Sequence, residues 1–181
     1  MKLSSSGHKV VAVENKKGPF ENLFSNVMDN GFADIECVLA DGIDYLPPQV
    51  DCCCILGMGG ATIYEILSKH VERLEQFNSL IISPQSRFSM PIEFLYEHGF
   101  YNDNGLYIYE KRYYPILRFV KGNKVASTLE RKYGPFCVQS KDPILLTMLH
   151  KEIQEASLHI QNEEGKKKYF RLLSEVQEIE K

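Results

Sequence analysis

Short apolar segments alternate with helically patterned segments along the first 100 residues, and this alternation restricts the fold more than any other feature. The predicted strands are 8–14, 35–42, 51–57 and 79–84. Apolar residues spaced three or four positions apart predict helices from Gly18, from Thr62 and around 91–98. Strands that alternate with helices form α/β folds in which helices cover a sheet. The sequence therefore predicts a three-layer α/β domain with a mostly parallel sheet.

The rest of the chain predicts a hairpin and a helical tail. Residues 106–120 are expected to form one or two further strands, as a hairpin. After Asp142-Pro143, apolar residues about four positions apart indicate a helix, and a polar turn at 162–168 precedes a second apolar stripe. Two helices joined by a short turn pack as an antiparallel pair. We therefore expect two domains, 1–140 and 141–181.

Three of the predicted strands end in residues suited to a nucleotide. Glu14 and Asp41-Gly42 end the first two strands, and Gly57-Met58-Gly59-Gly60 follows the third. Ligands of α/β sheets bind beyond the carboxyl ends of the strands, where an acid can accept hydrogen bonds from ribose hydroxyls. Glycine allows either a tight turn or close approach of a ligand to the backbone. Together these ends outline an adenosine-sized pocket, with a surface acid and simple turns as the alternative.

Composition and motif order exclude several other classes. In nicotinamide enzymes the glycine motif precedes the acid, whereas here the glycines follow both acids. No apolar stretch approaches the roughly 20 residues of a membrane helix, and the N-terminus lacks a signal-peptide core, so we expect a cytoplasmic protein. The five cysteines include no Cys-x-x-Cys pair, so no metal site is expected. Cys52 and Cys54 should share one strand face and Cys53 the other, as buried free thiols.

A basic, tyrosine-rich stretch stands out although the net charge is −3. Between Tyr109 and Pro135 lie seven Lys or Arg residues and two acids, with several tyrosines in or beside the same stretch. Cations interleaved with aromatic rings suit phosphate contact and base stacking. An exposed edge hairpin protected by lysines is the alternative.

The quoted motifs and their order resemble the bacterial tRNA adenine-N1 methyltransferases of the TrmK family. The resemblance rests on AVENKKGPFENL (12–23), LADG (39–42), ILGMGGATIYEIL (55–67), LIISPQ (80–85), EFLYEHGF (93–100), YYPI (113–116) and YGPF (133–136). It implies an α/β, Rossmann-like methyltransferase domain with a C-terminal helical pair. It also implies methyl transfer from S-adenosylmethionine to N1 of the adenine at position 22 of tRNA.

The resemblance also implies roles for particular residues. Glu14 would bind the ribose of the cofactor, Asp41 with Gly42 its adenine, and the glycine turn would form the floor where the methyl donor meets the base. The implied cofactor-binding residues are Glu14, Asn15, Asp41, Gly42, Gly57, Met58, Gly59 and Gly60. The expected RNA-binding residues are Lys16, Lys17, Arg87, Lys111, Arg112, Tyr114 and Lys121. No catalytic base is assigned: Asp44 and His70 are the nearest candidates, and each is expected to be a surface residue.

Departures from the family pattern lead to further expectations. Ser83-Pro84-Gln85 and Tyr114-Pro115-Ile116 replace the usual Gln-Pro-Asn and Tyr-Glu-Ile. The family's first, central strand and its acidic Asp-x-Gly-x-Asp-His loop are not found in this sequence, which suggests an upstream start or a truncated copy. We therefore expect a split sheet, weak or no binding of S-adenosylmethionine and little methyltransferase activity of this chain. The alternative function is an inactive homologue that binds RNA or acts as a scaffold.

The helical tail is expected to be dispensable for folding of the α/β domain and necessary for tRNA binding. The sequence leaves the oligomeric state open.

Overall fold

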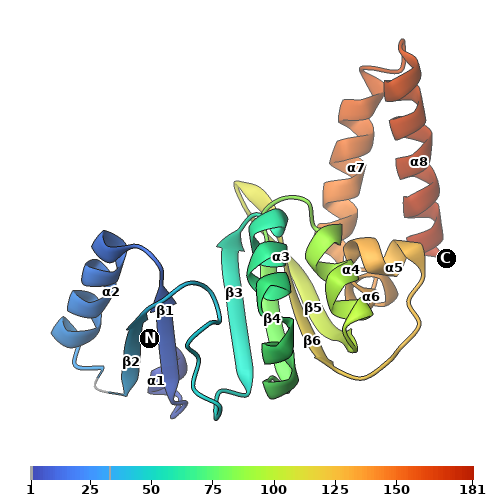
Figure 1. Ribbon diagram of the computed structural model, residues 1–181. Coiled ribbons are helices and arrows are strands. Elements are labelled where there is room, and N and C mark those ends of the chain that lie inside the picture. Colours follow the sequence, from blue (N-terminus) through green and yellow to red (C-terminus); the bar gives the residue numbers. More distant parts are fainter. Residues whose placement is uncertain (1, 33) are drawn as a thin grey trace. The chain divides into compact units, whose positions relative to one another are not determined.

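The computed structural model describes residues 2–32 and 34–181 (Figure 1). Its elements are, in chain order, α1 (Lys2–Ser5), β1 (Val10–Glu14), α2 (Lys17–Asp29), β2 (Ile35–Leu39), β3 (Cys52–Met58), α3 (Gly60–Lys69), the 3-10 helix η1 (Val71–Gln76), β4 (Ser79–Pro84), α4 (Ser89–Glu97), β5 (Phe100–Glu110), β6 (Arg112–Lys121), α5 (Thr128–Tyr133), α6 (Pro135–Gln139), α7 (Pro143–Ser157) and α8 (Glu163–Glu180). They form two compact units, Met1–Cys53 with Tyr64–Asn78, and Cys54–Ile63 with Ser79–Lys181. Each unit is described by itself.

The first unit contains a two-stranded parallel sheet. β1 pairs with β2 from Val10↔Ile35 to Glu14↔Leu39. Between them, α2 begins at Lys17 and has Pro19 in its first turn, where proline needs no amide hydrogen. The helix ends at Asp29, and Gly31 follows with a φ of 69°, a conformation that suits glycine. The sequence predicted the start of this helix, at Gly18, to within one residue.

The second unit contains a four-stranded sheet in the order β3-β4-β6-β5. β6 is antiparallel to both β4 and β5. The predicted strand segment at 106–120 is thus part of a hairpin, as expected, and the hairpin makes this sheet mixed. The expectation of a mostly parallel sheet is wrong for this unit, because strands joined by a tight turn must run antiparallel.

The strands pair in two separate sheets. Within residues 2–32 and 34–181, β1 has one strand partner, β2, and β3 has one, β4. This division agrees with the expectation of a split sheet. One face of β3 is exposed and includes Leu56 and Met58. Cys52 and Cys54 lie on that face, so the expectation that they are buried is wrong, whereas Cys53 on the other face is buried as predicted.

The tail forms the expected antiparallel pair, α7 and α8, which pack along a buried apolar seam (Figure 1). The Asp142 carboxylate caps α7 by accepting from the amides of Ile144 and Leu145, and it also accepts from the Tyr107 amide of β5. Asn162 caps α8, so most of the predicted polar turn is already helical.

The helical pair is also attached to the rest of its unit through α8. Glu175 accepts hydrogen bonds from the Tyr133 hydroxyl (2.7 Å) and the Lys132 ammonium (2.6 Å). The domain boundary at residue 140 and the dispensability of the tail for folding remain predictions. None of the described helices combines the length and the apolar character that crossing a membrane would require.

Candidate cofactor and RNA sites

The carboxyl ends of β1 and β2 bring the predicted acids together. Glu14 and Leu39 are register partners, and the Ala40 amide donates to the Glu14 carbonyl at 3.0 Å. Just beyond the two strand ends, the Asn15 side-chain amide donates to Oδ1 of Asp41 at 3.5 Å. Gly42 then turns the chain with a φ of 59°, which favours glycine. Four of the predicted cofactor residues therefore share one edge of the first unit.

The Asp41 carboxylate at this edge is exposed and Glu14 is partly exposed, and both carboxylates retain acceptor capacity. Oε1 of Glu14 accepts from the Lys16 amide at 3.0 Å. Oδ2 of Asp41 accepts from the Lys69 ammonium at 2.6 Å. A carboxylate can accept about four hydrogen bonds, so each acid can still accept from a hydroxyl or an amino group. The residues present thus fit the ribose and adenine of an adenosine ligand.

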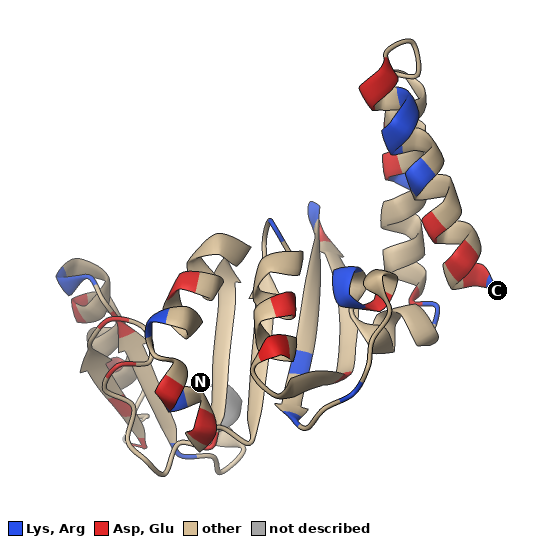
Figure 2. Ribbon diagram, turned by 45° about the vertical axis from the view of Figure 1, so that its right-hand side comes forward, with Lys and Arg blue, Asp and Glu red and all other residues tan. Residues whose placement is uncertain are grey.

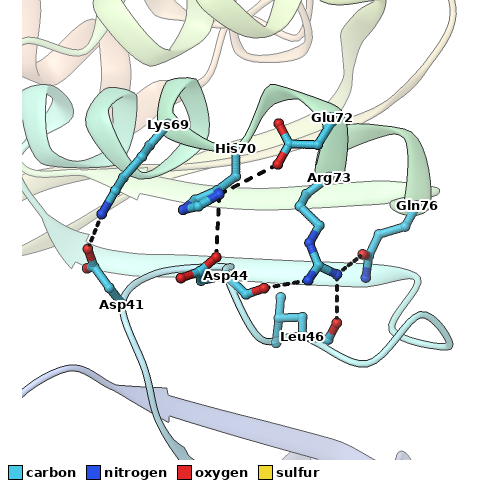
Figure 3. A network of polar contacts seen from close by, with 8 residues as sticks. All are labelled: Asp41, Asp44, Leu46, Lys69, His70, Glu72, Arg73 and Gln76. Atoms are coloured by element: carbon cyan, nitrogen blue, oxygen red, sulfur yellow. Dashed lines mark hydrogen bonds and ion pairs between the residues drawn. The ribbon is translucent and has the colours of Figure 1, made fainter.

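Side chains that follow α3 brace the loop that begins with Asp41 (Figure 3). The Arg73 guanidinium donates to the carbonyls of Leu46 (3.0 Å) and Asp44. Gln76 donates to the carbonyls of Pro47 (3.2 Å) and Val50 (3.0 Å). These bonds satisfy four carbonyls of a loop with no regular structure, which would otherwise depend on water. Arg73 and Gln76 thereby hold the loop that presents Asp41 and Gly42.

The candidate bases Asp44 and His70 belong to the same brace. Nδ1 of His70 lies 3.6 Å from carboxylate oxygens of both Asp44 and Glu72. Only 16% of the His70 side chain is exposed, so the expectation of a surface residue is wrong for this histidine.

The sequence analysis missed the bracing role of Lys69, Arg73 and Gln76. Their spacing of four and then three residues places polar groups on one side of a helical segment, and this was the available signal. Their partners lie 26 to 29 residues away in the chain, which no local pattern reveals.

Lys69 favours the ionised form of Asp41. Its hydrogen bond and positive charge lower the pKa of the Asp41 carboxyl, and the pKa of Lys69 is raised in turn. The folded state gains stability from this pair above the ordinary pKa of aspartate and loses that stability as pH falls through the lowered pKa of Asp41.

In Lys69→Met, the pKa of Asp41 should rise toward its ordinary value in a carbon-detected NMR titration. Lys17→Met, which removes only a distant partner of Glu21, should leave it unchanged. An unaltered Asp41 titration in Lys69→Met would contradict this interpretation.

In the second unit, the glycine turn after β3 packs against the segment that follows β4. The Gly60 amide donates to the Ser86 carbonyl at 2.7 Å, and the Gln85 amide donates to the Met58 carbonyl at 2.8 Å. A methyl group on Gly60 would lie 2.3 Å from the Arg87 carbonyl oxygen and 2.5 Å from that of Ser86. Gly57 has a φ of 78°. The chain's own backbone thus requires Gly57 and Gly60, whether or not a ligand also approaches them.

The predicted RNA-binding residues lie in several places. Lys111 and Arg112 occupy the tip of the β5–β6 hairpin, and Tyr114 follows on β6. Lys121 lies at the opposite end of β6, paired with Phe100. Arg87 lies in the turn after β4, while Lys16 and Lys17 begin α2 in the first unit. The structure therefore brings together three of the seven, and Lys121 is separate from them.

Other cations of the basic stretch have partners within the unit. Arg118 forms a two-pronged ion pair with Asp103, at 2.9 and 2.7 Å. Lys132 pairs with Glu175, and Arg131 lies over the Tyr96 ring. These three cations are engaged within the unit, so they are weaker candidates for phosphate contact than Lys111 and Arg112 at the hairpin tip.

Comparisons with known proteins agree with this architecture. The family model for tRNA (adenine(22)-N(1))-methyltransferase, TrmK, matches residues 4–181. A Streptococcus pneumoniae structure, proposed to be a tRNA (m1A22) methyltransferase, is 26% identical with a TM-score of 0.86, covering 99% of this chain and 84% of that one. The same protein in complex with S-adenosyl-L-methionine gives a TM-score of 0.84.

A more distant solved structure supports the fold. M. capricolum TrmK, solved with S-adenosyl-homocysteine, is 20% identical with a TM-score of 0.78, covering 98% of this chain and 82% of that one. Among curated protein sequences, none matches this chain. The family match extends over nearly every residue, from before β1 to the end of α8. The chain therefore belongs to the tRNA (adenine(22)-N(1))-methyltransferase family.

Proposed function

We propose that this chain transfers a methyl group from S-adenosylmethionine to N1 of the adenine at position 22 of tRNA, in the cytoplasm. The observation that carries the proposal is the meeting of Glu14, Asn15, Asp41 and Gly42 at the carboxyl edge of the β1–β2 sheet, in a member of this family. Family membership favours an enzyme over the alternative of an inactive RNA-binding homologue. The expectation that residues 1–181 bind the cofactor weakly stays a prediction.

The edge residues of the first unit are suited to hold the adenosine part of the cofactor. Glu14 has one carboxylate oxygen engaged by the Lys16 amide and the other available for ribose hydroxyls. Asp41 can accept from the adenine amino group while it remains paired with Lys69. When bound, S-adenosylmethionine supplies an electrophilic methyl group on a sulfonium sulfur. The Arg73 and Gln76 braces hold Asp41 and Gly42 ready for that ligand.

The chemistry asks little of a catalytic base. Neutral adenine carries a lone pair on N1, so no proton has to leave before the attack. The chain's tasks are then to hold the unpaired adenine in line with the methyl group and to exclude water. We assign the Gly57–Gly60 turn to the target base, because its backbone lies at the carboxyl end of β3, the edge where ligands of such sheets bind.

Methyl transfer to tRNA transcripts tests the proposal. Transfer of a labelled methyl group from S-adenosylmethionine is expected to a transcript with adenine at position 22. A matched transcript with guanine at that position should accept none there, because N1 of guanine carries a hydrogen and has no free lone pair. Equal labelling of both transcripts would show that position 22 is not the target.

The hairpin tip should bind phosphate groups of the tRNA. Removing one cation that neutralises a phosphate lowers the slope of log affinity against log salt by up to about 0.9. The double variant Lys111→Ala/Arg112→Ala should therefore reduce the slope of tRNA binding by up to about 1.8, with weaker binding at low salt. Lys121→Ala, measured separately, shows whether the far end of β6 takes part.

Lys9→Ala serves as the control for this measurement. Lys9 is exposed and precedes β1, at the amino end of that strand, away from the edge that bears Glu14. Its removal should leave the slope unchanged. If the double variant leaves the slope unaltered as well, the lysines protect a sheet edge and do not bind RNA.

A further inference from the structure

The β5–β6 hairpin projects beyond the carboxyl edge of the four-stranded sheet. Pairing between β4 and β6 ends at Ile82↔Leu117, whereas β5–β6 pairing continues through five more pairs, from Leu106↔Ile116 to Glu110↔Arg112. At about 3.4 Å per residue, the hairpin extends about 17 Å past the last β4–β6 pair. In Figure 1 its yellow tip lies beyond the arrowhead of β3. The hairpin therefore stands on the sheet edge that bears the glycine turn.

The structure separates the tyrosines of this region into two groups. Tyr107 and Tyr133 are buried, and the Tyr107 hydroxyl donates to the Tyr133 carbonyl at 3.3 Å. Tyr109 and Tyr113 are register partners near the tip, with ring centroids 4.8 Å apart. Tyr109 is 57% exposed, and Tyr113 is partly exposed. The first group belongs to the core, and the second forms an accessible aromatic surface.

The tip combines this aromatic surface with cations. Lys111 and Arg112 directly follow Tyr109 and Glu110, and both are exposed. Within the described chain, neither the Lys111 nor the Arg112 side chain forms an ion pair. Figure 2 shows the charged residues of the chain. An edge protected by lysines alone would not need a pair of exposed rings. Aromatic rings flanked by cations are the arrangement by which proteins bind unpaired nucleotides.

We infer that Tyr109 and Tyr113 form a stacking platform for an unpaired base of the tRNA, with Lys111 and Arg112 on the adjoining phosphates. The inference rests on the proposed function, since it takes tRNA as the ligand. The platform would add a direct contact between the two tyrosine rings and a tRNA base. That base would lie next to the carboxyl edge of the four-stranded sheet, where methylation is proposed. The target adenine or its neighbour must leave its stack before methylation, and a protein ring can replace the stacking partner that the base gives up.

A single tryptophan can report on this contact, because the chain has none of its own. Tyr109→Trp places an indole on the platform, and stacking on a base should quench its fluorescence in a saturable titration with tRNA. Val125→Trp is the control. Val125 is fully exposed and follows the end of β6 that pairs near Ser79, at the opposite edge of the sheet. Its emission should change little.

Affinity measurements separate stacking from charge. Each stacked base is worth about 1–3 kcal/mol, so Tyr109→Ala should weaken tRNA binding roughly 5- to 150-fold. Its salt slope should not change, because the variant keeps every cation that displaces counterions from the RNA. Tyr109→Phe retains the ring and should bind like the parent chain.

Three outcomes would overturn the platform: equal emission changes at positions 109 and 125, unchanged affinity in Tyr109→Ala, or no binding of tRNA by the parent chain. Methyl transfer by the same protein is assayed in parallel. Transfer without quenching rejects the platform alone, and quenching without transfer rejects the proposed function alone.

Discussion

Replacing Gly60 by alanine is expected to lower the free energy of unfolding of its unit by about 3 kcal/mol or more. The added methyl carbon would lie 2.3 and 2.5 Å from the carbonyl oxygens of Arg87 and Ser86, well inside contact distance. These oxygens belong to backbone, and the Ser86 carbonyl also accepts the Gly60 amide at 2.7 Å, so neither can move without breaking the turn. Alanine otherwise favours a helix by about 1 kcal/mol over glycine, so a loss of stability must come from the clash.

Gly59→Ala is the matched control for this prediction. The nearest atom to its methyl group would be the Ser86 hydroxyl oxygen at 3.2 Å, and a hydroxyl can rotate away. Gly59→Ala should change the free energy of unfolding, measured in urea, by no more than about 1 kcal/mol. If Gly60→Ala is as stable as Gly59→Ala, the 85–87 segment does not pack on the turn as described, and Gly60 would have to be explained by a ligand.

Replacing Glu14 by alanine is expected to raise the KM for S-adenosylmethionine roughly 10- to 100-fold with little change in kcat. A hydrogen bond to a charged group is worth about 1.5–3 kcal/mol, and the variant removes the acceptor proposed for the ribose hydroxyls. Glu14 is assigned to the adenosine and not to the reacting atoms, so its removal should weaken binding of the ground state and the transition state equally.

Glu21→Ala provides the control for the cofactor measurement. Glu21 is an exposed acid of α2 in the same unit, and its nearest cation is Lys17 at 4.0 Å. The Glu21→Ala variant should leave the KM for S-adenosylmethionine unchanged. Asp41→Asn should raise KM as well, because an amide accepts fewer hydrogen bonds and no longer pairs with Lys69. An unaltered KM in Glu14→Ala would remove the assignment of the β1–β2 edge to the cofactor.

The sequence predicted those elements whose determinants are local. β4 spans Ser79–Pro84 as expected, since its apolar residues are flanked by turn residues. The ends of α2 follow from Pro19 and Gly31. The acids at 14 and 41 lie at one edge of the sheet because their strands are parallel neighbours, which strand–helix alternation implies.

The sequence-based predictions were wrong for elements whose ends depend on contacts with distant parts of the chain. Thr62 and Glu65 resemble a capping box, yet α3 begins at Gly60, where the Ser86 carbonyl accepts the first amide. The capping box that does form, Ser127 with Glu130, begins the short helix α5, which was not predicted. The brace from Arg73 and Gln76 to loop carbonyls, like the glycine turn against 85–87, likewise depends on tertiary contacts.

Analysis of the methylated nucleoside tests the central claim most directly. The 181-residue protein is incubated with a tRNA transcript and an excess of S-adenosylmethionine, which allows for weak cofactor binding. The tRNA is then digested and analysed by liquid chromatography and mass spectrometry. We expect 1-methyladenosine at position 22, and a marked decrease with Glu14→Ala at limiting cofactor. Folded protein that yields no methylated nucleoside at any cofactor concentration, or that methylates another atom of adenine, would contradict the account.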